Sequence, residues 1–249
     1  MPHAEPFVIA AVRSAADPSD TEAREWVRQE AAHAAAHRGF NTQLTSRSRV
    51  ARALDRLGAW MFGRLRNRSD AFSLAFAAAF ELVAFASARW AEAGLQKYFR
   101  GADETAATLF LWHLAEEVEH KGVVHELFTR NANARRRYPI ALLVAFVSLI
   151  GFTIVGGLAL FCSSRHVWNP VRWFRLVGWG VSLAFVLLPV LAISLSEHFD
   201  PATLVDPPWM AAWLREYDPV TETMPLWTAA GGLGDDQIAK RSARRPPSV

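Results

Sequence analysis

Two short stretches of the sequence combine carboxylates and imidazoles at a spacing that suits a metal site. In the first, Glu30 is followed by His33 and His37 among alanines. Alanine is the strongest helix former, so this stretch is predicted to be helical. At 3.6 residues per turn, positions i, i+3 and i+7 fall within an arc of about 60°. The three side chains are therefore expected to project from one face of the helix.

The second stretch contains His113, Glu117 and His120, which share a helical face at i, i+4 and i+7, with Glu116 beside them. A Glu-x-x-His pair on a bundle helix is the ligand spacing of carboxylate-bridged dinuclear metal proteins. For either motif alone, a solvated or core-polar role is an equal alternative. Because two copies occur, we predict that the two helices face each other across a metal site.

Two further residues are added to the candidate ligands. Glu81 is the only charged residue between Ala71 and Ser87. A buried carboxylate in such surroundings must be protonated, paired or metal-bound. His198 follows the last long apolar stretch and reaches the site only if the chain folds back; otherwise it is a histidine at a membrane interface. The predicted ligands are Glu30, His33, His37, Glu81, His113, Glu117, His120 and His198, of which His37 and His113 either bind metal or orient a ligand.

Mixed carboxylate and imidazole donors suit iron, manganese or zinc, whereas calcium prefers oxygen alone. We expect two divalent ions, with iron as the first choice. Such a pair supports oxygen-dependent hydroxylation or desaturation, or hydrolysis of an ester or amide with Glu116 or another glutamate of the site as the base. A non-catalytic, membrane-associated metal-binding protein is the third possibility. A zincin is excluded because His33 is followed by Ala34 and not by glutamate.

These residues need helices to position them. We expect a loose start over residues 1–17 and a metal-binding helical bundle over residues 18–131, with helices near 19–38, 47–66, 69–92 and 103–131. Ser19 to Glu22 fits a capping box, and Gly39 suits a helix stop. Phe72, Phe76, Phe80 and Phe85 on the third helix predict an apolar wall for a hydrophobic, lipid-like substrate.

Residues 132–200 are expected to form an apolar helical hairpin that packs on the bundle. The stretches 139–164 and 176–196 carry no charge, and each exceeds the roughly 20 residues that cross a bilayer. Arginine and tryptophan between them suit a membrane interface. We therefore expect attachment to the cytoplasmic side of the inner membrane. The alternative is a cytoplasmic protein in which the hairpin is a buried core pair.

The composition limits which covalent links, metal sites and partners the protein can have. A single cysteine excludes an internal disulfide and a cysteine-rich metal site. The net charge of +3, with arginines in a few runs and not on one helical face, argues against a nucleic-acid partner. A homo-oligomer is left open. Residues 201–230 read as a Pro/Trp-rich segment with one short helix near 209–216, and residues 231–249 as a disordered basic tail.

The pattern Gln29-Glu30-x-x-His33-x-x-x-His37-x-x-Phe40-Asn41, with Glu81 and Trp112-His113-x-x-Glu116-Glu117-x-Glu119-His120-Lys121, resembles the bacterial family called predicted metal-dependent hydrolases. The likeness covers roughly residues 20–200. It implies an all-α, ferritin-like helical bundle that binds metal, and the family name implies hydrolysis. Together with the apolar hairpin, this is the fold that we expect.

Overall fold

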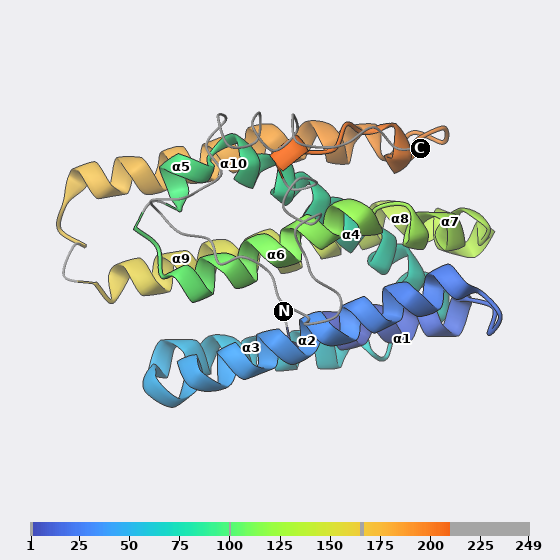
Figure 1. Ribbon diagram of the computed structural model, residues 1–249, viewed down its shortest axis with the longest axis horizontal. Coiled ribbons are helices and arrows are strands. Elements are labelled where there is room, and N and C mark those ends of the chain that lie inside the picture. Colours follow the sequence, from blue (N-terminus) through green and yellow to red (C-terminus); the bar gives the residue numbers. More distant parts are fainter. Residues whose placement is uncertain (1, 100, 165–166, 210–249) are drawn as a thin grey trace, which may run out of the picture.

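The computed structural model describes residues 2–99, 101–164 and 167–209, and this part of the chain is all-helical, as predicted (Figure 1). No strand occurs within these residues. The longer helices are α1 (Glu5–Ala15), α2 (Thr21–Arg47), α3 (Arg49–Leu65), α4 (Asp70–Ala93), α6 (Glu104–His120), α8 (Ala132–Phe146), α9 (Phe152–Cys162) and α10 (Pro170–Ile193). The short ones are α5 (Leu95–Tyr98), α7 (Val123–Thr129), the π-helix η1 (Val147–Gly151) and the 3-10 helix η2 (Pro201–Thr203).

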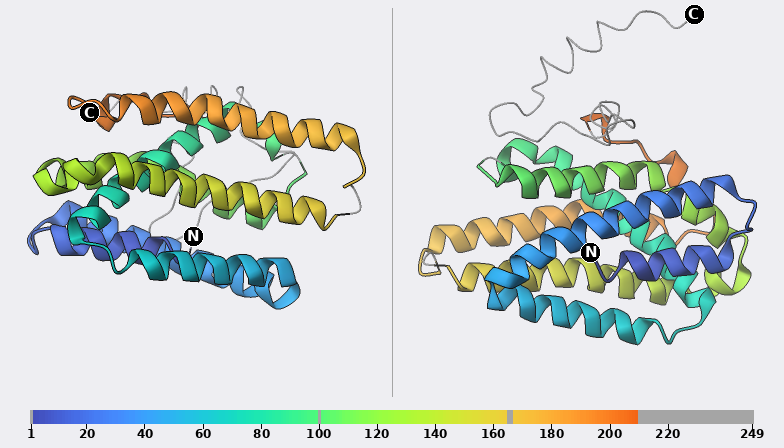
Figure 2. Two further views of the ribbon diagram at one scale, coloured as in Figure 1. Left: turned by 180° about the vertical axis from the view of Figure 1, so that it is seen from behind. Right: turned by 60° about the horizontal axis from the view of Figure 1, so that its bottom comes forward.

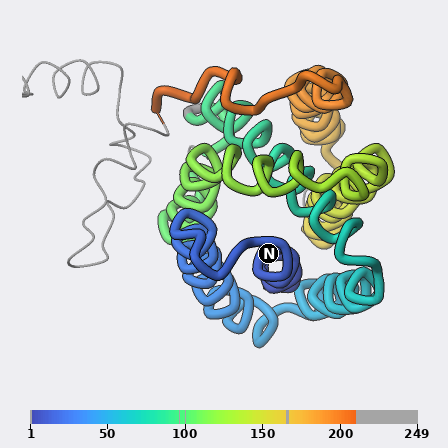
Figure 3. Tube along the Cα trace, turned by 90° about the vertical axis from the view of Figure 1, so that its right-hand side faces the viewer, coloured from blue at the N-terminus to red at the C-terminus, as the bar shows by residue number. Residues whose placement is uncertain are grey.

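Helix α4 crosses the interior of the molecule and packs against α1, α6, α7, α8 and α10 (Figure 3). It is buried on nearly every side, and Phe76, Phe80 and Phe85 are fully enclosed. A helix that is apolar all round belongs in a core or a membrane, and here the bundle itself surrounds it. Glu81 lies midway along this helix and is therefore carried into the centre of the bundle.

The N-terminus is a helix, so the predicted loose start over residues 1–17 is wrong. Helix α1 buries Phe7, Val8 and Val12 against α2 and α4. Pro6 does not oppose this helix, because it occupies the first turn, where the missing N–H would have no partner in any case. The consequence for the site is that Glu5 sits on a fixed element.

Helix α2 begins as predicted and ends later than predicted. Asp20 caps it by accepting a hydrogen bond of 3.0 Å from the Ala23 backbone N–H. The helix then passes through Gly39, where a stop was expected, and continues to Arg47. An interior glycine costs only about 1 kcal/mol relative to alanine, so it does not by itself end a helix. The helix therefore extends nearly three turns beyond His37.

The region expected as one helix over residues 103–131 is divided into α6 and α7 at Lys121 and Gly122. The hairpin has the predicted order: α8, η1 and α9 form one arm, and α10 forms the other (Figure 2). Both arms and α4 are long and apolar enough to cross a membrane. The apolar window of α4 is 83 % buried, whereas those of the two arms are 28 % and 22 % buried. Within the described part of this chain, the two arms are therefore mostly exposed and do not form a buried pair.

The short helix expected near residues 209–216 lies outside the described residues from position 210 onward, and so does the basic tail. Residues 201–209 are described and continue from η2 to Trp209. The Trp209 backbone N–H donates to Glu92 Oε1 at 2.6 Å, which fixes this segment against α4.

Candidate metal centre

Nine glutamates and histidines from four helices gather inside the bundle. Each is at most 9 % exposed. Helix α1 supplies one, α2 three, α4 one and α6 four: Glu5, Glu30, His33, His37, Glu81, His113, Glu116, Glu117 and His120. The two stripes seen in the sequence thus face each other, with one carboxylate entering from α1 and one from α4.

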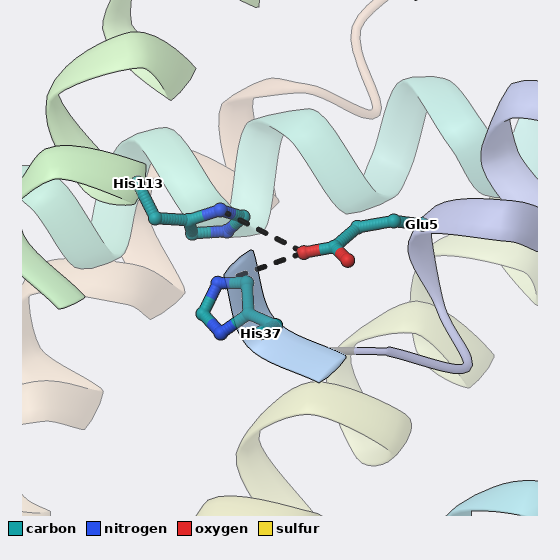
Figure 4. A group of neighbouring side chains, drawn as sticks. All are labelled: Glu5, His37 and His113. Atoms are coloured by element: carbon teal, nitrogen blue, oxygen red, sulfur yellow. Dashed lines mark ion pairs between the residues drawn. The ribbon is translucent and has the colours of Figure 1, made fainter. Parts of the chain in front are cut away.

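The first group of donors joins α1, α2 and α6 (Figure 4). Oε1 of Glu5 lies 3.7 Å from Nε2 of His37 and 3.8 Å from Nδ1 of His113. The ligand atoms of all three residues lie within 4.8 Å of one another. One carboxylate and two imidazoles converging in this way suit a transition-metal cation.

Two more groups continue from the first along α6. In one, Nε2 of His113 lies 3.2 Å from Oε1 of Glu117, and His33 completes the three donors. In the other, Glu117 joins Glu30 and His120, whose Nδ1 is 3.0 Å from Oε1 of Glu30. His113 and Glu117 each belong to two groups, so the donors form one continuous chain through the core.

The donor atoms themselves show that the residues fit a metal. Buried polar atoms are nearly always hydrogen-bonded, and each exception needs an explanation. Both carboxylate oxygens of Glu5, Glu81 and Glu117 and both ring nitrogens of His113 are buried and make no well-aligned hydrogen bond as ionised or neutral groups. Glu117 does lie beside Nε2 of His113 at 3.2 Å, and the carboxyls of Glu81 and Glu117 can bond to each other when one is protonated. Nε2 of His37 and Nδ1 of His120 are also unpartnered. Burying so many carboxylate oxygens and imidazole nitrogens without well-aligned hydrogen bonds is costly unless cations bind them.

The remaining contacts fix the orientations of the His33 and His120 rings. His33 lies between two carboxylates: its Nδ1 is 3.1 Å from Oε1 of Glu30, and its Nε2 contacts Glu116. Nε2 of His120 lies 2.9 Å from Oε1 of Gln29. Because that amide oxygen can only accept, Nε2 of His120 donates to Gln29, and Nδ1 is left to interact with Glu30 or with a cation bound there. Gln29 therefore sets the tautomer of His120.

Burial and neighbouring groups shift the pKa values in opposite directions. Burial raises the pKa of Glu5 to about 8 and lowers the pKa of His37 to about 3. Burial, reinforced by the nearby carboxyls of Glu81 and Glu30, raises the pKa of Glu117 well above its usual value. Burial would lower the pKa of His33, but its bonds to Glu116 and Glu30 outweigh it and raise that pKa to about 10. Burial would likewise raise the pKa of Glu30, but its hydrogen bonds with His120 and His33 outweigh it and lower that pKa to about 2. Without a cation, burial therefore favours the protonated form at Glu5 and Glu117 but not at Glu30.

The predicted ligand His198 lies outside the centre, and Glu5 belongs to the centre although the sequence did not predict it. His198 is exposed beyond the end of α10, and none of the three donor groups contains it. Its neighbour Phe199 instead accepts a bond from His125 through its backbone oxygen. Glu5 was missed because the two early prolines masked the helix. The available signal was the run Phe7-Val8-x-x-Ala11-Val12, which has helical spacing and starts just after Glu5.

A cavity of about 410 Å³ reaches the centre from one end of the bundle. His37 and His113 line it, together with apolar side chains from α3, α4, α9 and α10, among them Leu54, Met61, Phe62, Trp179 and Leu183. Phe72, Phe76, Phe80 and Phe85, predicted to form this wall, pack in the core and do not line the cavity. The apolar character was predicted, but other residues provide it.

Comparison with known proteins gives one result. The model of a family described as "predicted metal-dependent hydrolase" matches residues 1–204. That span includes all nine residues of the centre. No curated protein and no solved structure matches the chain.

Proposed function

The chain belongs to the family of predicted metal-dependent hydrolases, and from this premise we propose that it hydrolyses an ester or amide of an apolar compound at a dinuclear metal centre. The observation that carries this proposal is the buried cluster of carboxylates and imidazoles, two of whose histidines, His37 and His113, line an apolar cavity.

Two cations are proposed because two of the donor groups share no residue. Glu5, His37 and His113 form one, and Glu30, Glu117 and His120 form the other. Glu81, which is fully buried beside the carboxyl of Glu117, would serve as a further ligand. Iron, manganese and zinc all accept such donors. Their charge would replace the protons that the buried carboxyls otherwise need.

For hydrolysis, a bound divalent cation would supply a water of lowered pKa and polarise the carbonyl. The protein's part is to receive the proton. Glu116 is suited to this, because it borders the centre and contacts His33, whose raised pKa keeps that ring charged. The contact with His33 holds the Glu116 carboxyl in a fixed orientation beside the centre. The apolar wall of the cavity excludes water from the reacting group and favours a hydrocarbon substituent.

Oxygen chemistry is the second candidate, and the order of the donors along the chain favours it. Lone glutamates on α1 and α4 alternate with Glu-x-x-His pairs on α2 and α6. In ferritin-like di-iron and di-manganese carboxylate proteins, two bundle helices each give a glutamate and two give a Glu-x-x-His pair. Under this candidate, the apolar compound would be hydroxylated or desaturated.

One experiment separates the candidates. The protein is loaded with Zn²⁺, or with Fe²⁺ under argon, and offered p-nitrophenyl acetate and p-nitrophenyl decanoate. We expect the zinc protein to release nitrophenol without oxygen, and faster from the decanoate. Glu116→Gln should abolish this at unchanged metal content, whereas Glu119→Gln, on the exposed side of the same turn, should not. Absence of hydrolysis with either metal overturns the proposal, and oxygen uptake by the iron protein then supports the second candidate.

A further inference from the structure

The two arms of the hairpin expose a continuous apolar surface, which we call the outer face. On α8 and η1 it includes Ile140, Leu143 and Val147, and on α10 it includes Phe174, Val181 and Phe185. Phe174 and Phe185 are 79 % and 77 % exposed. On α10 these side chains recur at helical spacing, while Leu183, Leu187 and Val190 turn inward to the bundle. Exposed apolar surface of this extent marks an interaction site.

The charges around the outer face point to one kind of partner. Residues 132–196 contain no aspartate or glutamate. Arg135, Arg136 and Arg137 are exposed at the start of the first arm, and Arg172 and Arg175 at the start of the second. Trp168, between the arms, is 91 % exposed. Apolar surface with arginine and tryptophan at its ends suits lipid hydrocarbon with anionic headgroups. A second copy of this surface would instead bring like charges together.

The mouth of the cavity lies at the rim of the outer face. Three large apolar side chains line the cavity and are also exposed: Leu44 of α2 by 44 %, Phe110 of α6 by 41 % and Leu160 of α9 by 58 %. Leu160 belongs to the first arm of the hairpin, so the opening and the outer face adjoin. Figure 1 shows the ends of α2 and α9 and the start of α6 at the same end of the molecule.

We propose that the outer face docks on an anionic lipid bilayer and that the apolar substrate enters the cavity from the bilayer at Leu160, without crossing water. The inference rests on the proposed function only in taking the substrate to be apolar. Long-chain compounds partition into hydrocarbon because each methylene favours it over water. An entrance beside the hydrocarbon therefore meets a far higher concentration of substrate than an entrance facing water.

Docking is tested by flotation of the full chain with vesicles of phosphatidylcholine containing 30 % phosphatidylglycerol. We expect wild type to float, and the double variant Phe174→Glu/Phe185→Glu to lose at least 90 % of that binding. Val205→Glu is the control, because Val205 is equally exposed but lies outside the hairpin. Circular dichroism of each variant verifies the fold. Docking on lipid would be overturned if wild type failed to float. It would also be overturned if wild type formed a stable dimer that the double substitution dissociates.

Entry is tested by transfer of cis-parinaric acid, a fluorescent fatty acid, from vesicles to the protein. Leu160→Trp should slow transfer at least tenfold without changing flotation. Leu188→Trp is the matched control, since Leu188 is on the outer face but does not line the cavity. Equal transfer rates in both variants would overturn the entrance at Leu160. The readout is binding and not turnover, so a failure of the hydrolysis assay leaves this result unaffected.

Discussion

Glu5 in the first turn of α1 directs Oε1 to within 3.8 Å of Nδ1 of His113 on α6. The same oxygen lies 3.7 Å from Nε2 of His37 on α2. One carboxylate near the N-terminus thus joins the two histidine-bearing helices. Because α2 and α6 also meet directly through His33–Glu116 and Glu30–His120, Glu5 adds a third helix to a centre that these two helices already form.

Glu5→Ala should reduce the metal content of the protein by about half, because it removes the only carboxylate from one of the two disjoint donor groups. Glu22→Ala, an exposed glutamate in the first turn of α2, is the control and should leave metal content unchanged. Elemental analysis of protein purified without chelator provides the measurement. Full occupancy in Glu5→Ala would remove Glu5 from the ligand set.

Glu81→Leu should lower the metal content of the protein and raise the stability of the metal-free protein. Both carboxylate oxygens of Glu81 are buried without a well-aligned hydrogen bond, so a leucine in that place relieves a penalty when no cation is present. We expect a higher melting temperature than wild type without metal, and no further rise on adding metal. A variant that is less stable than wild type in chelator would show that Glu81 is satisfied by the protein alone.

Gln29→Ala should weaken metal binding without removing a ligand. The Gln29 side chain fixes the tautomer of His120 through a contact of 2.9 Å. Loss of such an orienting partner typically lowers metal affinity by 10- to 100-fold. Titration with a competing chelator measures the change. Gln29→Glu, which keeps the accepting oxygen, should retain affinity near wild type; if it falls as far as Gln29→Ala, the orienting role is wrong.

Metal affinity should rise with pH between about 6 and 8. Burial raises the pKa of Glu5 to about 8, so this carboxyl is protonated below that pH and must lose its proton when a cation binds. His37, with a pKa lowered to about 3, is already neutral and releases none. Calorimetry in buffers of different ionisation enthalpy counts the protons. The Glu5→Gln variant should release about one proton fewer at pH 6.5; an unchanged count would contradict the assignment.

The sequence by itself determined the local chemistry. Glu30, His33 and His37 share a helical face because their spacing is periodic, and so do His113, Glu117 and His120. The lone charge at Glu81 in an apolar helix also indicated a buried, functional carboxylate. The two uncharged stretches of the hairpin were visible for the same reason: backbone periodicity and the cost of burying charge are local properties.

Only the tertiary structure decided which of these residues meet. The packing of α1 against α2 and α4 brings Glu5 into the centre, and no local signal ties that residue to His113. The place of His198 was equally undetermined, because it depends on where α10 ends relative to the bundle. Gly39 resembled a stop, yet the helix continues to Arg47, because the penalty of about 1 kcal/mol for one interior glycine is too small to end a helix by itself. Spacing fixes which face a side chain occupies, whereas long-range packing fixes what that face touches.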